Sequence, residues 1–120
     1  RASLPTTLRT LSAIAPVVLI LAPPDLLRDP FKAFPHGLEV RPARADHLRR
    51  NLLVRELATT TAAIDPRIRV VDPTPLFCRG EYCEAVLDSS LAYQDDNHVS
   101  AHGALMLEQP FAVAAASLGL

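Results

Sequence analysis

Apolar side chains change their spacing near the start of the chain, which predicts a helix followed by a strand. Four of them lie three or four positions apart: Leu4, Leu8, Leu11 and Ile14. This spacing is typical of one helix face, and Pro16 would end the helix. The unbroken apolar run 17–21 has the length of a strand covered on both faces, and Pro23 and Pro24 stop it.

The next segment lacks a clear period and is rich in proline. Between Pro24 and Arg44, the prolines and Gly37 predict an irregular excursion with at most a short helical turn at 26–28. A single amphipathic helix is expected to follow. Its apolar positions are Ala45, Leu48, Leu52, Leu53, Leu57 and Ile64. Asp65 and Pro66 would end it.

A second short apolar run, 68–71, ends at Asp72 and Pro73. Two strands separated by a helix predict a parallel crossover connection. In such sheets ligands bind beyond the carboxyl ends of the strands. The loop 72–99 follows the second strand, so we expect a functional site there.

The end of the chain has a helical composition. Ser100 precedes an alanine-rich segment, and its hydroxyl is suited to cap the first turn. Pro110 either kinks this helix or starts a new one.

Length and composition allow one hydrophobic core. The chain has 120 residues, 49% of them hydrophobic, so we expect residues 1–120 to form a single domain. With 12 basic and 13 acidic residues, it offers no electrostatic surface for nucleic acid. The apolar stretch 13–22 is shorter than the roughly 20 residues of a membrane span, and no signal peptide is recognisable. Because the chain begins with Arg1, we expect it to be processed or cut from a longer protein.

Cys78 and Cys83 enclose a four-residue spacer that contains Gly80. Such a spacer can close into a small disulfide ring, which would suit an oxidising compartment. A zinc half-site is the competing interpretation, although no second Cys or His pair is found at ligand spacing. Two free buried thiols are the third.

Asp95 lies three residues before His98, just ahead of the last helix. An acid beside a histidine can hold the imidazole tautomer that accepts a proton from a serine. In that case the Asp95 carboxylate should reach His98 Nδ1, and Nε2 should point into a cleft at the carboxyl end of the sheet. The alternative is that Asp95 caps the following helix and His98 is a surface residue with no cleft before it. Asp96 competes with Asp95 as the orienting acid.

Several other polar residues receive structural interpretations. His98 and His102 are four residues apart and could chelate a metal with Asp95. No further ligand is evident, so no metal is expected. His36 and His47 are expected at the surface, and Asp72 in a turn or cap. The four arginines are expected to form a solvated face, although they could meet an anionic glycan or lipid headgroup: Arg41, Arg44, Arg49 and Arg50.

The run Tyr93–Ala104 resembles the last sequence block of SGNH hydrolases. It is most similar to the SGNH domain that follows the membrane acyltransferase-3 domain of bacterial glycan O-acetylases. There the block reads roughly Tyr-x-Asp-x-x-His-Leu-Ser-x-x-Gly-Ala, and Val99 is the one departure. The resemblance extends backwards through the order of elements to the run 69–73 and the pair Cys78 and Cys83.

This resemblance implies the C-terminal part of a flavodoxin-like, three-layer α/β domain. His98 would be the general base and Asp95 its orienting acid. The Gly-Asp-Ser nucleophile block is missing, and no glycine precedes a serine as Gly-x-Ser, so this chain alone is expected to be inactive. No cofactor is implied. The related fused domains often pair the two cysteines, so the resemblance favours a Cys78–Cys83 disulfide.

The resemblance also implies partners and a compartment. The parent protein would transfer acetyl groups from an acylated donor to an extracytoplasmic glycan through an acyl-serine. The partners would be the N-terminal part of the SGNH domain and an integral-membrane acyltransferase domain, at the periplasmic or extracellular face. The alternatives are a secreted SGNH carbohydrate esterase, and a non-catalytic remnant or binding module without the nucleophile.

Overall fold

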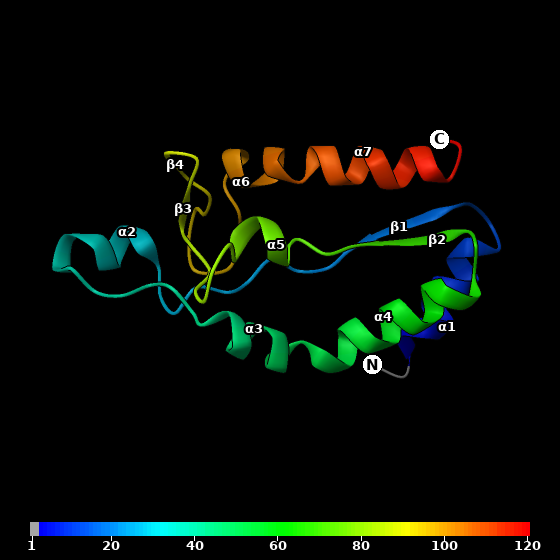
Figure 1. The fold of residues 1–120 in the computed structure, drawn as a ribbon, viewed down its shortest axis with the longest axis horizontal. Helices are drawn as coiled ribbons and strands as arrows, with labels where there is room; N and C mark the ends of the chain where they lie inside the picture. The colour runs from blue at the N-terminus through cyan, green and yellow to red at the C-terminus, as the bar shows by residue number, and fades with distance from the viewer. Residues whose placement is uncertain (1–2) are drawn as a thin grey trace.

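The computed structural model of the protein describes residues 3–120, arranged in three layers around a short parallel sheet (Figure 1). The strands β1 (Val17–Ile20) and β2 (Ile68–Val71) pair in parallel. The helices α1 (Ser3–Ser12) and α4 (Leu52–Ile64) cover one face, and α7 (Glu108–Ser117) covers the other. The predicted α/β class, with parallel strands and flanking helices, is confirmed.

β1 is less covered than a strand buried on both faces. Its first three residues are half-buried, and Ile20 is 38% exposed. The amides of Val17 and Leu21 donate to carbonyls of the β2 segment, those of Arg67 and Val71. Within residues 3–120 β1 pairs only with β2, so its other edge has no strand beside it. Helices lie on both faces of β1, as predicted, but this open edge leaves the strand only half-buried.

The proline-rich excursion contains a short helical segment, but not at 26–28. Instead α2 (Pro30–Ala33) is followed by the 3-10 helix η1 (Phe34–His36). The Asp29 side chain accepts a hydrogen bond from the Phe31 amide, and Pro30 occupies the first helical position. This Asp-Pro start signal explains the shift along the sequence.

The expected long helix is divided at Asn51 into α3 (Arg44–Arg50) and α4. Its buried face also differs from the prediction. Leu52, Leu53 and Ile64 are exposed by 52%, 57% and 66%, whereas Ala58 and Thr61 are buried. Small side chains at the contact let α4 approach α1 and β2 closely, which the apolar periodicity did not reveal.

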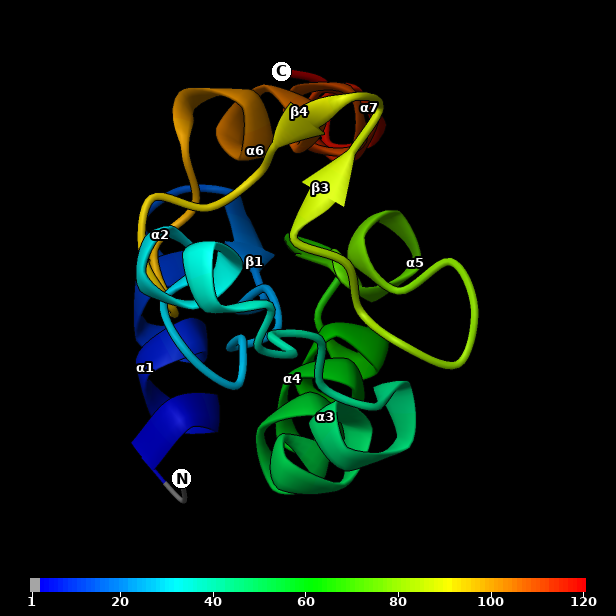
Figure 2. The ribbon, with the colours of Figure 1, turned by 90° about the vertical axis from the view of Figure 1, so that its left-hand side faces the viewer.

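The long loop after β2 contains elements that the sequence did not predict. A short helix α5 (Thr74–Phe77) precedes a hairpin of β3 (Val86–Leu87) and β4 (Ser90–Leu91). Figure 2 shows the hairpin near the two last helices, α6 (Ala101–Met106) and α7. Pro110 lies inside the first turn of α7, so of the two alternatives the proline marks a new helix.

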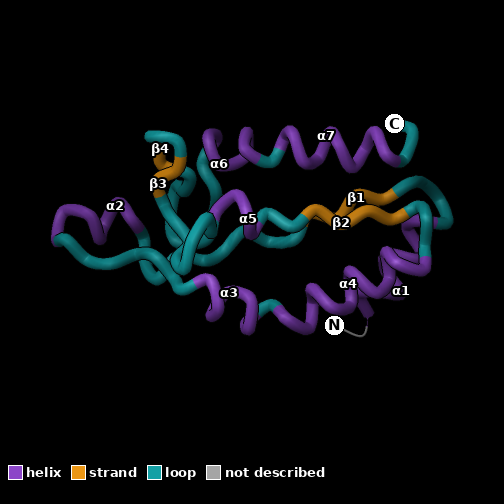
Figure 3. The backbone as a smooth tube through the Cα atoms, viewed as in Figure 1, coloured by secondary structure: helices purple, strands orange, loops and turns teal. Residues whose placement is uncertain are grey.

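The largest buried cluster lies at one end of the molecule. It centres on Phe77 and Tyr93, and includes Leu26, Val40 and Leu87. Figure 3 shows loops and short elements gathered at this end, toward which both strands run. The core therefore supports the connections beyond the carboxyl ends of the strands, where the site was expected.

Candidate active site

The Asp95 and His98 side chains are presented by a compact, closed loop. The Gln94 amide donates to the His98 carbonyl at 2.9 Å, and Tyr93 and Val99 form an antiparallel bridge at the base. Asp95 Oδ1 accepts hydrogen bonds from the amides of Asn97 (2.9 Å) and His98 (2.7 Å). The two backbone amides thus fix the position of the carboxylate independently of the imidazole ring.

The second carboxylate oxygen of Asp95 lies 2.9 Å from His98 Nδ1. An ionised carboxylate only accepts hydrogen bonds, so Nδ1 carries the proton and Nε2 is left as the acceptor. The pKa of Asp95 is lowered, first by the Asn97 amide and further by the hydrogen bonds from His98. The carboxylate therefore stays ionised and holds one imidazole tautomer. This is the Asp–His geometry that the sequence predicts.

Ser100, and not Asp95, caps the N-terminus of helix α6. The Ser100 hydroxyl accepts from the Gly103 amide at 3.2 Å and donates to the Leu91 carbonyl at 2.7 Å. The expectation of a Ser100 cap is confirmed, and the capping alternative for Asp95 is wrong. Asp96 contributes its backbone carbonyl to the fold and makes no contact with the His98 ring among the described residues.

Buried anchors hold this loop against the end of β1. The Tyr93 ring is 1% exposed, and its hydroxyl donates to the Pro24 carbonyl at 2.6 Å. The Leu26 amide donates to the Asp96 carbonyl at 2.7 Å. Because Pro24 and Leu26 follow β1, the pair lies at the carboxyl end of the sheet, as expected.

Gly103 lets α6 pass close to the loop. A Cβ atom at this position would lie 2.3 Å from the Ala92 carbonyl oxygen and 2.9 Å from Val99 Cβ. The glycine is therefore required by a close approach of backbone to backbone. The contacts of Tyr93, Ser100 and Gly103 thus explain why these residue types occupy their positions in the motif around Asp95 and His98.

His102 does not share a site with His98. Its Nε2 lies 2.8 Å from the Leu87 carbonyl oxygen, to which it donates. In residues 3–120 there is no group of three or more His, Cys, Asp or Glu side chains that could hold a metal ion. His102 thus fastens α6 to the β3–β4 hairpin.

The expected cleft in front of His98 is not found. The His98 side chain is 67% exposed, and the principal pockets of the described residues are lined by other side chains. No serine hydroxyl within residues 3–120 is hydrogen-bonded to His98. The structure therefore brings the acid and the base together on an open surface, without a nucleophile beside them. An exposed His98 with no cleft before it is what the alternative interpretation expected, so the prediction of a cleft within the described part of this chain was wrong.

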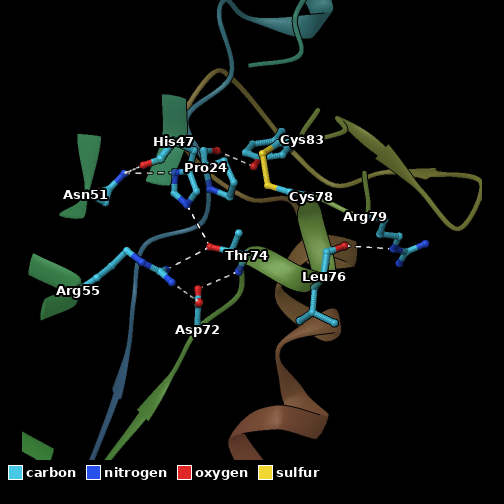
Figure 4. Close-up of a disulfide and its surroundings, with 11 residues drawn as sticks. Pro24, His47, Asn51, Arg55, Asp72, Thr74, Leu76, Cys78, Arg79 and Cys83 are labelled. Atoms are coloured by element: carbon cyan, nitrogen blue, oxygen red, sulfur yellow. Dashed lines mark hydrogen bonds and ion pairs between the residues drawn. A yellow bond between two sulfur atoms is a disulfide. The ribbon is translucent and has the colours of Figure 1, made fainter. Parts of the chain in front are cut away.

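Cys78 and Cys83 are joined by a disulfide that belongs to the buried core cluster (Figure 4). Both residues are buried, at 1% and 0% exposure. Their Cα atoms are 3.9 Å apart, closer than the usual range of about 4.4 to 6.8 Å. The predicted disulfide is confirmed.

A second histidine site was missed by the sequence analysis, which placed His47 at the surface. His47 is only 6% exposed, and its Nε2 lies 3.2 Å from the Thr74 hydroxyl (Figure 4). Its Nδ1 faces the Asn51 amide at 3.2 Å. Burial, followed by the charge of Arg55, lowers the pKa of His47. Thr74 comes from a separate part of the chain, so no local sequence signal reveals this contact.

Asp72 completes this cluster. It accepts from the Thr74 amide at 3.0 Å and pairs with Arg55 at 2.7 Å. Burial alone would raise its pKa, but the hydrogen bonds from Arg55 and Thr74 lower it to about 2. Asp72 is a turn residue, as predicted, and also an anchor between α4 and the end of β2.

Three of the four arginines, Arg44, Arg49 and Arg50, are exposed, as expected for a solvated face. Arg41 pairs with Glu39 and Glu84, and its guanidinium lies 4.9 Å from the centre of the Tyr82 ring. Arg49 pairs with Asp46. Arg50, although exposed, also lines a small pocket between α3 and the segment that follows β1.

The fold and this pair define the class of protein: an α/β protein that presents a carboxylate–imidazole pair at the carboxyl end of parallel strands. The family model described as SGNH domain (fused to AT3 domains) matches residues 1–113, and the chain belongs to this family. The suspected relationship is thereby confirmed. Neither the curated proteins nor the solved structures gave a match. Within residues 3–120, no helix is long and apolar enough to cross a membrane.

Proposed function

We propose that this chain is the acid–base part of an SGNH acyltransferase that moves acetyl groups to extracytoplasmic glycans. One observation carries the proposal. Asp95 binds His98 at Nδ1, and no described residue occupies Nε2, the nitrogen that must accept a proton. The family relationship supports hydrolase or acyltransferase chemistry for such a pair.

The reaction would use a serine from the N-terminal part of the SGNH domain. His98 Nε2 takes the serine proton as the serine oxygen bonds to the acyl carbon, and returns it to the departing oxygen of the donor. The acceptor hydroxyl then loses its proton to His98 and takes the acyl group, and the serine recovers a proton. Asp95 stabilises the imidazolium in both halves. General acid–base catalysis of this kind contributes about 10²- to 10⁴-fold in rate.

The open edge of β1 supports a partner for this chain. Backbone groups of Val18 and Ile20 face the edge without a strand, because those of Val17 and Leu21 face β2. A further strand carrying the nucleophile would add here and bring a serine to the carboxyl end of the sheet, near His98. The exposed histidine would then lie at the wall of a cleft that two segments form together.

Two features support an extracytoplasmic location next to a membrane domain. The family is described by its fusion to AT3 domains, and the disulfide is of the kind that persists in oxidising compartments. An acylated donor and a glycan acceptor are the proposed substrates.

The test is a comparison of two histidines in the complete parent protein. His98→Ala should reduce acetyl transfer by at least about a hundredfold. His102→Asn is the matched control, because His102 is a nearby histidine on α6 whose ring is bound to a backbone carbonyl and not to Asp95. It should retain most activity. Equal activity of the His98 variant and the control would overturn the proposal and favour the alternative of a non-catalytic module.

The fate of the acetyl group in the presence of a glycan acceptor distinguishes an esterase from a transferase. Release of free acetate, with no transfer when a glycan is present, would instead favour a secreted SGNH esterase. The 120-residue chain alone should show no turnover of an activated acetyl ester above its own His98→Ala variant, because the proposed serine lies outside it.

A further inference from the structure

A small polar pocket lies between the segment that follows β1 and helix α3. Its volume is about 150 Å³, close to that of about five liquid water molecules. Ligand pockets for whole small molecules are usually larger, at about 300 to 1,000 Å³. The pocket therefore suits one edge of a larger ligand.

Two charged side chains in this pocket lack protein partners. Asp25 and Arg50 both line it, yet neither forms an ion pair within residues 3–120. Asp46, a further lining residue, is already paired with Arg49. The pocket thus offers one free hydrogen-bond acceptor group and one free donor group.

The remaining wall of the pocket is uncharged. Asn51 donates to the His47 carbonyl at 2.9 Å, which leaves its amide oxygen as a further acceptor. His47 forms the inner wall, and its lowered pKa, caused mainly by burial, keeps the ring neutral. Pro23 and Leu27 add apolar surface. Vicinal hydroxyl groups on an apolar ring fit this arrangement, because each hydroxyl both donates and accepts.

The same segment also anchors the loop of the acid–base pair. Asp25 lies between Pro24, whose carbonyl accepts from Tyr93, and Leu26, whose amide donates to Asp96. A ligand held by Asp25 would therefore border the loop that carries His98. The pocket and the proposed catalytic base belong to one end of the sheet.

We propose that this pocket is the acceptor subsite, which binds vicinal hydroxyls of a pyranose through Asp25, Arg50 and Asn51. The saccharide is thereby directed toward His98 by its other edge. The assignment as an acceptor subsite rests on the proposed function, whereas saccharide binding itself does not.

The experiment is an amide NMR titration of the 120-residue chain with the methyl glycosides of glucose, galactose and mannose. At least one glycoside should give saturable shifts at Asp25, Leu27, Arg50 and Asn51. Asp25→Asn and Arg50→Gln should each weaken its binding about tenfold, since each removes a hydrogen bond to a charged group. The matched controls Asp96→Asn and Arg44→Gln should bind as the unaltered chain does, because neither side chain lines the pocket.

Absence of saturable shifts with all three glycosides up to their solubility would overturn the subsite. Unchanged binding by both Asp25→Asn and Arg50→Gln would do the same, and so would shifts centred elsewhere. Sodium acetate is titrated in parallel, and a response at Arg50 to acetate alone would indicate an anion site and reject the saccharide. If either variant loses its dispersed spectrum, Asp25→Ser and Arg50→Lys replace it.

The two proposals fail separately. Loss of saccharide binding in the pocket variants, together with a fully active His98→Ala parent, would reject the function and keep the binding site. An inactive His98→Ala parent with no saccharide binding would reject only the subsite.

Discussion

The two histidine sites of this molecule differ in what their ring nitrogens contact. His98 is 67% exposed, and its Nδ1 is held by Asp95 while Nε2 faces solvent. His47 is 6% exposed, and both of its nitrogens face protein groups, Thr74 and Asn51. A carboxylate-bound imidazole with one free nitrogen is equipped to move protons. A buried imidazole with both nitrogens occupied is equipped to hold elements together.

The two sites also differ in where the stabilising contacts lie. In the His98 loop the functional pair is exposed, and the stability comes from buried neighbours such as Tyr93 and Gly103. In the His47 cluster the polar groups themselves are buried or half-buried. Substitution of His98 should therefore change the chemistry with little effect on stability. Substitution within the His47 cluster should lower the stability itself.

The largest effect is expected from Gly103→Ala, which breaks the support of the His98 loop. The new methyl group would lie 2.3 Å from a backbone oxygen that cannot move freely. We expect a loss of about 3 kcal/mol in the free energy of unfolding, the upper range for overpacking. Gly80→Ala is the matched control, since its Cβ would meet open space. Denaturant unfolding of both variants measures the difference, and equal stabilities would contradict the close approach.

The second-largest effect on the free energy of unfolding is expected in the His47 cluster, and it can be compared directly with the His98 site. Thr74→Val removes the hydroxyl that contacts His47 and Arg55, which leaves the buried His47 Nε2 without a partner while Arg55 keeps Asp72. It should cost about 1 to 2 kcal/mol. His98→Ala, on the open surface, should change stability by no more than about 0.5 kcal/mol. Thr60→Val, at an exposed position of α4, controls for the loss of a hydroxyl. A larger cost for His98→Ala than for Thr74→Val would reverse the comparison.

A smaller effect concerns pH. The ordinary pKa of histidine is 6.5, and in the folded protein burial lowers that of His47. The unfolded chain therefore takes up the proton first as the pH falls, so stability is complete above about pH 6.5 and declines below it. Between about pH 7.5 and about pH 5.5, His47→Asn should lose less stability than the unaltered chain. An unchanged pH dependence in this variant would show that His47 is not the responsible group.

The smallest effect is expected in the hairpin that His102 fastens to α6. Asp88 and Ser89 have positive φ angles of 53° and 66°. Glycine adopts such angles without steric cost, so Ser89→Gly should stabilise the protein by about 0.5 to 1 kcal/mol. Asp88 pairs with Arg79, so Asp88→Gly should gain less. Thermal unfolding of the two variants decides the order.

The same contrast explains what the sequence could predict. Asp95 and His98 are three residues apart, and the carboxylate that orients the ring lies within one loop, so a local pattern revealed them. His47, Thr74 and Asp72 meet only because α3 and the end of β2 pack together, and nothing in their local sequence records that contact. Periodicity placed both strands but misjudged α4, where small residues form the contact.

The central claim is that Asp95 holds His98 with its proton on Nδ1 and leaves Nε2 free to accept one. Nitrogen-15 NMR of the histidine rings, at a pH where they are neutral, measures this directly. The account predicts a protonated Nδ1 and an unprotonated Nε2 for His98, and a loss of this preference in Asp95→Asn. A proton found mainly on Nε2 of His98 in the unaltered chain would contradict it.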